Sequence, residues 1–342
     1  MEKETITLYK ADLHVHSNFS NKASIWAMKK INCPESYTPP SLIYTEAKKK
    51  GMHYVTITDH NTLDGSLQIA HLPETFLSAE ITVYFPENGC KAHVVVLDIS
   101  EAHFKTAMAL RKNVYEMTAF LRAESIRHVI AHPLYSMSEK LTVDIVEKML
   151  LLFEAVEIKN GSHAPAQNDL IRDVVMSLTP EKIERLADKH DLKPAGNIPW
   201  KKICVGGSDD HSGIFIARAF TCGPSSGTAS AFMDAIWYGH GTVGGENGDA
   251  LMLAHSIYGV AYRFYQEHIG HKTRQSPFVD MLVNKYLSAQ PKKLSLREKI
   301  RFFIKKNLPD TGHLQHHLQS AKQVKMNQET ARPPHAPVRI HR

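Results

Sequence analysis

The sequence predicts an α/β fold in which strands alternate with helices and close into a barrel. Short apolar runs rich in β-branched residues recur along the chain, and stretches of helical character separate them. Such alternation is typical of parallel α/β folds. At 342 residues the chain is long enough for one large barrel, and seven strands suit a barrel better than an open sheet.

The expected strands share one property, which is that each apolar run ends in polar or ionisable residues. They are residues 9–15, 54–58, 76–83, 93–99, 128–131, 155–159 and 203–207. Helical character is found between them in residues 40–50, 102–124, 143–153 and 179–191. Neither a P-loop nor a GxGxxG fingerprint is present, so the sequence gives no sign of a nucleotide-binding loop.

The end of the chain differs from the rest in charge. Residues 291–342 contain twelve Lys or Arg and three Asp or Glu, a net +9 within a total of +6, which leaves −3 for residues 1–290. We therefore expect one folded domain over residues 1–290, followed by a basic helix at residues 292–306 and a disordered tail. The tail lacks interleaved aromatics, so nucleic-acid binding is not expected. The histidine-rich stretch 313–317 is interpreted as a polar tract.

The cysteines and the N-terminus indicate a reducing, cytoplasmic location. Cys33, Cys90, Cys204 and Cys222 have no paired CxxC spacing, which excludes a zinc ribbon and argues against a disulfide framework. The N-terminus has no apolar signal region, and no stretch reaches the roughly 18 apolar residues that span a bilayer. We expect no membrane contact.

Four strand ends carry histidine and acidic side chains. They read DLHVHS (residues 12–17), ITDHN (57–61), AHPL (131–134) and GGSDDHSG (206–213). Residues two apart in a strand point to the same face, so His14 and His16 can converge on one ion. The carboxyl ends of barrel strands open onto one face, and the four segments are therefore expected to form one cluster.

In this order, the four segments resemble the motifs of the PHP (polymerase and histidinol phosphatase) superfamily. The resemblance covers roughly residues 8–260, and it is closest to a branch with a longer first loop, here residues 21–37, that is sometimes encoded joined to glycosyltransferases. It implies a distorted (β/α)7 barrel with a di- or trinuclear metal site on its C-terminal face. A functional link to glycosyltransferases is a further implication.

The resemblance also implies which residues hold the metals. The first ion would be bound by His14, His16, Glu80 and Asp209, and the second by Glu80, His93 and His132. The residues themselves agree, because Glu80 lies within an apolar strand and a glutamate can bridge two cations about 3.5–4 Å apart. Histidine-rich ligation with carboxylates favours zinc, iron or manganese.

A third ion is implied by His60 and His211, completed by an acid or histidine in the loop after the HxH pair. That position holds Asn21, a poor neutral ligand, so the third site is expected to be weak, absent or completed from elsewhere. Asp59 could bind a metal directly or accept a hydrogen bond from a ligand histidine, and we favour the second role. The candidate catalytic residues are Asp59, His211 and Arg218, the last either as a bidentate phosphate donor or as a structural arginine.

This chemistry predicts a metal-dependent hydrolase acting on a small phosphorylated substrate. Two cations bridged by a carboxylate lower the pKa of a shared water and neutralise phosphoryl oxygens. Two alternatives stay open. One is an amidohydrolase-like enzyme that cleaves a C–N bond, although that family usually relies on a carboxylated lysine where this chain has Glu80. The other is a non-catalytic metal-binding PHP module.

Overall fold

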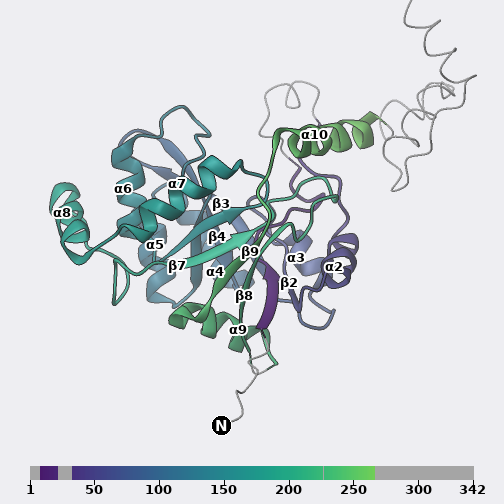
Figure 1. The fold of residues 1–342 in the computed structure, drawn as a ribbon, viewed down its shortest axis with the longest axis horizontal. Coiled ribbons are helices and arrows are strands. Elements are labelled where there is room, and N and C mark those ends of the chain that lie inside the picture. The colour runs from purple at the N-terminus through teal and green to yellow at the C-terminus, as the bar shows by residue number, and fades with distance from the viewer. Residues whose placement is uncertain (1–7, 22–32, 226, 266–342) are drawn as a thin grey trace, which may run out of the picture. The chain divides into compact units, whose positions relative to one another are not determined.

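A computed structural model of the chain describes residues 8–21, 33–225 and 227–265 (Figure 1). The chain divides into two compact units, residues 1–274 and 275–342, and every described residue belongs to the first. The expected helix at residues 292–306, the tail and the histidine tract at 313–317 lie outside the described residues. Within them, no helix is both long enough and apolar enough to cross a membrane.

The strands form two sheets. The first has the order β2-β1-β8-β9, with bounds Tyr54–Val55, Leu8–Asp12, Ala219–Pro224 and Thr242–Gly245. The second has the order β3-β4-β5-β6-β7, with bounds Ser78–Phe85, Cys90–Leu97, Arg127–Ala131, Ala155–Asn160 and Ile203–Gly207. All seven expected strands are found, and β8 and β9 are additional.

The α/β class is confirmed, but the expectation of a closed barrel is wrong for the described part of the chain. Only β1-β2 and β5-β6-β7 pair in parallel, whereas β3-β4, β4-β5, β1-β8 and β8-β9 pair antiparallel. The link from β3 to β4 is residues 86–89, far shorter than the dozen or so residues of a parallel crossover. Isolated bridges, Val15 with Asp210 and His60 with Glu80, join the two sheets where a barrel would need full ladders.

Helices surround the sheets (Figure 1). Their bounds are α2 Pro40–Lys49, α3 Asp64–Ile69, α4 Glu101–Leu110, α5 Val114–Ala123, α6 Val143–Leu152, α7 Pro165–Met176, α8 Pro180–His190, α9 Ala229–Ala235, the π-helical turn η1 Ile236–His240 and α10 Ala250–Tyr265. The stretch 102–124, expected to be continuously helical, is two helices. Asn113 begins the second, because its side chain accepts a hydrogen bond from the Tyr115 N–H at 3.0 Å.

Two apolar clusters hold this arrangement together. The larger packs the outer face of the second sheet against α4, α5, α6 and α7 through buried residues such as Val94, Met117 and Met149. A second cluster lies between the sheets and contains Leu13 from the segment after β1 and Val129 from β5. Its burial fixes the two sheets against each other, so that residues at the ends of their strands share one edge.

Candidate metal centre

The structure brings the eight predicted ligands together at this edge. They form four overlapping groups whose ligand atoms lie within 4.8 Å of one another: His14, Glu80 and His132; His14, His16 and Asp209; His60, Glu80 and His93; and His16, His60 and His211. Most follow the carboxyl end of a strand, as expected. His93 lies near the start of β4, and the antiparallel direction of that strand places it beside Ala131 at the end of β5.

Glu80 lies at the centre of the cluster and is fully buried. Both of its carboxylate oxygens face histidine nitrogens, at 2.8 to 3.3 Å for Oε1 and 2.8 to 3.4 Å for Oε2. The partners are His14, His93 and His132 for Oε1 and His16 and His60 for Oε2. A carboxylate with imidazoles around each oxygen has the arrangement needed to bridge two cations.

Asp209 also faces two of these histidines, His14 and His16. Its Oδ1 lies 3.5 Å from Nε2 of His14 and 3.3 Å from Nε2 of His16. Asp209 and His132 both have a left-handed backbone, with φ of 50° and 28°. Strained backbone at non-glycine residues is concentrated at functional sites, and here two proposed ligands carry it.

The buried polar atoms test whether cations fit this cluster. Six of them have no partner with hydrogen-bond geometry, although several lie close to an opposite charge: Nε2 of His14, His16 and His211, Nδ1 of His60 and His93, and Oε2 of Glu80. An unsatisfied buried polar group costs about 1–3 kcal/mol, so a cluster of six is expensive unless something else satisfies it. Imidazole and carboxylate donors that converge in this way fit divalent transition metals.

The electrostatics of the cluster support the same interpretation. Burial alone would raise the pKa of Glu80, but the surrounding histidines, of which His93 contributes most, hold it well below its ordinary value. Burial alone would lower the pKa of His14, but the nearby carboxylates, Asp209 foremost, hold it well above. Burial and positive neighbours lower the pKa of His16. The carboxylate of Glu80 is therefore ionised, as ligation requires, and the carboxylates around His14 favour a positive charge at that position.

Glu157 and Asn160, which sequence reasoning missed, support the ligands from β6. Glu157 Oε1 lies 2.9 Å from Nδ1 of His14, and Oε2 accepts a hydrogen bond from the His132 N–H at 2.8 Å. Asn160 Nδ2 donates to Glu157 at 3.0 Å and to Asp209 at 3.1 Å. This carboxylate fixes the ring of His14 so that Nε2 faces the cluster. The available signal was an acid inside an apolar strand, the same signal that Glu80 gave.

Asp12 and Gly207 bring the first and last motifs together. Asp12 accepts hydrogen bonds from the N–H groups of His14, Ser208 and Ala217 at 3.2, 2.8 and 2.8 Å. A Cβ atom on Gly207 would lie 2.4 Å from Cβ of His14, so only glycine allows this close approach. Asp12 therefore has a positioning role at the junction of β1, β7 and β8.

Asp59 contacts a histidine indirectly. Its carboxylate accepts hydrogen bonds from the Ser17 N–H and from the hydroxyls of Ser17 and Ser20, and Ser20 Oγ lies 3.1 Å from Nδ1 of His16. The expected direct bond from a histidine is thus replaced by a path through Ser20. Burial raises the pKa of Asp59. Its position is that of a residue that orders the loop after β1, and its candidate catalytic role stays a prediction.

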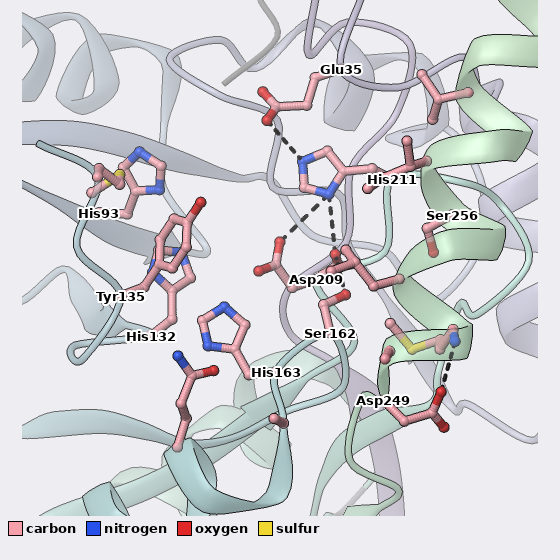
Figure 2. A pocket seen from close by; sticks show the side chains of 18 of the residues that line it. Glu35, His93, His132, Tyr135, Ser162, His163, Asp209, His211, Asp249 and Ser256 are labelled. Carbon is pink, nitrogen blue, oxygen red and sulfur yellow. Dashed lines mark hydrogen bonds and ion pairs between the residues drawn. The ribbon is translucent and has the colours of Figure 1, made fainter. Parts of the chain in front are cut away.

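An acid in a position to complete the predicted third site lies elsewhere in the first loop. Asn21 is exposed, whereas Glu35 lies 3.3 Å from Nε2 of His60 and 3.9 Å from Nε2 of His211 (Figure 2). The sequence left three outcomes open for this site: weak, absent or completed from elsewhere. The position of Glu35 fits the last of these. Glu35 gives no sequence signal, because it lies outside any strand or helix and far along the chain from the motifs.

Arg218 has structural partners. Its Nε donates to the Asn247 carbonyl at 3.0 Å, and its Nη2 lies 3.3 Å from Glu246 and 3.6 Å from Asp249. It does not line the cavity beside the cluster. Of the two roles considered for it, this geometry favours the structural one.

A cavity of about 680 Å³ opens beside the cluster. Proposed ligands line one side, including His93, His132, Asp209 and His211, and residues of α10 line the other (Figure 2). His163, also missed from the sequence, lies in its wall with its ring 5.5 Å from that of His132. This volume is within the range typical of small-molecule sites, about 300–1,000 Å³.

Comparison with known proteins gives a short sequence match and several structural ones. No family model matches the chain. An uncharacterized protein of Methanocaldococcus jannaschii is 42% identical over 67 residues, which are 20% of this chain and 37% of that protein. The chain thus spans little more than a third of the length of this relative.

Among solved structures, a two-domain protein from Bacteroides vulgatus contains a predicted PHP-like metal-dependent phosphoesterase; its TM-score is 0.45 at 15% identity, over 75% of this chain and 71% of that one. A lesion-specific endonuclease from Pyrococcus furiosus has a TM-score of 0.40 at 14% identity, over 69% and 58% of the two chains. An amidohydrolase from Chromobacterium violaceum, solved with sulfate and no metal, has a TM-score of 0.39 at 15% identity, over 59% and 87%.

Proposed function

We propose that this protein is a metal-dependent hydrolase of the PHP superfamily that cleaves a phosphate ester. The observation that carries the proposal is Glu80, a fully buried carboxylate with histidine nitrogens within 3.4 Å of each oxygen. A buried carboxylate is costly unless positive charge neutralises it. Two cations held by the surrounding histidines would neutralise Glu80, and its two oxygens would bridge them.

The ligands divide around this carboxylate. His14, His16 and Asp209 would hold one ion with Glu80, and His93 and His132 would hold a second with the same carboxylate. Ions bound there would lower the pKa of a water molecule and neutralise phosphoryl oxygens. Zinc, manganese or iron suits these donors best.

The chain's own groups orient this site and limit access to it. Glu157 holds the ring of His14 in place, and Asp59 orders the loop that carries His16 through Ser17 and Ser20. His60, His211 and Glu35 would form a third, more open position at the cavity, where a substrate oxygen or a third ion can bind. Substrate would reach the site through the cavity, because His93, His132, Asp209 and His211 line it.

Both alternatives have less support. A carboxylated lysine bridge is excluded at the centre of the cluster, because the bridging position holds Glu80. A degenerate module would be expected to have lost ligands, whereas all eight positions carry metal-binding side chains. The cytoplasmic location, the small phosphorylated substrate and the link to glycosyltransferases stay predictions.

The test is turnover by the purified full chain reconstituted with Mn²⁺ or Zn²⁺. A panel of phosphomonoesters and phosphodiesters should show release of phosphate or alcohol that chelation abolishes and metal restores. A fully metallated protein that cleaves none of them, but hydrolyses amides in a parallel panel, would replace this proposal with the C–N hydrolase alternative.

A further inference from the structure

The cavity beside the cluster has two unlike sides. One side presents ring nitrogens and carboxylates, including His60, His132 and Asp209. The opposite side is the helix α10, whose Met252, Leu253, Ile257 and Val260 line the cavity, and Figure 2 shows Ser256 and Asp249 across the opening from His93 and His132. A bound molecule therefore meets metal ligands at one end and an apolar wall at the other.

Contacts with the first loop fix this wall in place. Val260 is buried in a small cluster with Cys33 and Tyr37, and Arg263 donates a hydrogen bond to the Tyr37 carbonyl at 3.2 Å. The same loop carries Glu35, which faces His60. The helix and the candidate third metal position are thus attached to one short segment.

Part of the wall is apolar and open to solvent. Leu253 is 50% exposed and Ile257 is 39% exposed, and they lie four residues apart, on one face of the helix. Large apolar side chains that line a concave site beside convergent polar groups are characteristic of ligand pockets. The wall and the metal ligands line the same cavity. A molecule that binds the metal cluster is therefore expected to place one of its groups against the wall.

The charges of the described cavity lining argue against a substrate with several phosphates. No lysine or arginine is present among the described residues that line it, whereas Glu35, Asp209 and Asp249 are. Arg218 is the cation beside Asp249, and it already pairs with Glu246. Beyond the metal ligands, a second phosphate group would find acids and apolar side chains where it needs cations.

We propose that the substrate is an ester with a single phosphate group and an apolar organic group, which packs against Leu253 and Ile257 of α10 while the phosphate meets the metal cluster. This inference rests on the proposed function and narrows its substrate class. Sugar phosphates are disfavoured by the same wall, because their hydroxyls would lose hydrogen bonds to water there. Nucleic acids are disfavoured by their several phosphates.

The test compares two non-hydrolysable ligands of equal carbon count on the metal-loaded full chain. By titration calorimetry, n-butylphosphonate should bind at least about tenfold more tightly than 3,4-dihydroxybutylphosphonate, since burying a hydroxyl against an apolar wall without a hydrogen bond costs about 1–3 kcal/mol. Equal binding, stronger binding of the dihydroxy ligand, or no binding of either would overturn the inference.

Two variants of α10 test whether the apolar wall causes the preference for the butyl ligand. Leu253→Asp should remove the preference for the butyl ligand, whereas Leu251→Asp, 69% exposed and outside the cavity lining, should leave it unchanged, both with wild-type metal content. Equal effects of the two variants would refute the role of the wall. Turnover of phosphate esters is measured separately, so a protein that hydrolyses them without a butyl preference contradicts this inference and leaves the proposed function standing.

Discussion

At the scale of single residues, the cluster depends most on Glu80. Replacing Glu80 by Gln preserves shape and packing but removes the charge that faces five histidines. We expect the variant to fold, to lose at least one metal ion per chain and to lose about 100-fold or more of its activity, since even supporting residues of metal sites contribute 10–100-fold. Elemental analysis and circular dichroism provide the measurement. The surface variant Glu74→Gln is the control, and equal metal content in the two would contradict the bridging role.

A second prediction concerns the third metal position. Glu35→Gln should weaken binding of the third ion about tenfold or more, because it removes a carboxylate that pairs with both His60 and His211. Asn21→Ala should have no effect, because Asn21 is exposed. Metal titration of both variants measures this, and the reverse order of effects would show that the loop ligand is Asn21 after all.

The candidate ligands also show which residues of the site can be predicted from the sequence. His14, His16, His60, His132 and Asp209 were predictable because each follows an apolar strand that carries a readable motif. Glu35 was not, since a loop residue acquires its position from the fold of the whole loop, here the packing of Cys33 and Tyr37 against α10. Arg218 was predictable as a nearby arginine, but its partners at residues 246–249 come from a segment with no signal of its own.

At the scale of elements, strands were easier to predict than their directions. The apolar runs located all seven expected strands, because burial on both faces leaves a clear signal. The antiparallel pairing of β3 with β4 follows from the four residues between them, 86–89, which allow a hairpin and no crossover. The strand β9 escaped prediction because its sequence, TVGG, contains two glycines and is held mainly by pairing with β8.

The buried His128 of β5 leads to a prediction of how the stability of the protein depends on pH. Burial lowers the pKa of His128 to about 4, while its Nδ1 lies 2.7 Å from the Ile126 carbonyl. Between pH 6.5 and about 4 the unfolded chain therefore binds a proton that the folded chain does not, so stability falls as the pH falls through this window. The loss attributable to His128 should approach about 3 kcal/mol at pH 4.

Chemical denaturation of the wild type and of His128→Asn across this window measures the effect. The asparagine keeps a donor for the Ile126 carbonyl but does not titrate, so its stability should decline less with acid by that amount. The metal ligands titrate in both proteins, so their contribution drops out when the two unfolding free energies are subtracted. This requires that both proteins have the same metal content. Parallel pH profiles would show that His128 titrates normally.

At the scale of the whole molecule, the cluster joins the two sheets. His14 and His16 follow β1 of the first sheet, whereas Glu80 and His93 lie in β3 and β4 of the second. Between these sheets the described backbone pairing is limited to isolated bridges. Metal ligation would therefore replace, at one edge, the ladders that would close a barrel, and it would couple metal binding to the stability of the entire described domain.

Removal of the metal should therefore destabilise the domain as a unit. At metal concentrations about 1,000-fold above the dissociation constant, binding adds about 4 kcal/mol, which corresponds to a fall in Tm on the order of 10 °C after chelation. Calorimetry should show one cooperative transition both before and after chelation, because the apolar cluster between the sheets contains residues of both. The control is Glu147→Gln in the surface group with Asp144 and His190, where Lys189 already donates to both carboxylates. This variant should show the same fall as the wild type, whereas a chelated protein that melts unchanged, or in two steps, would mean that the cluster does not hold the sheets together.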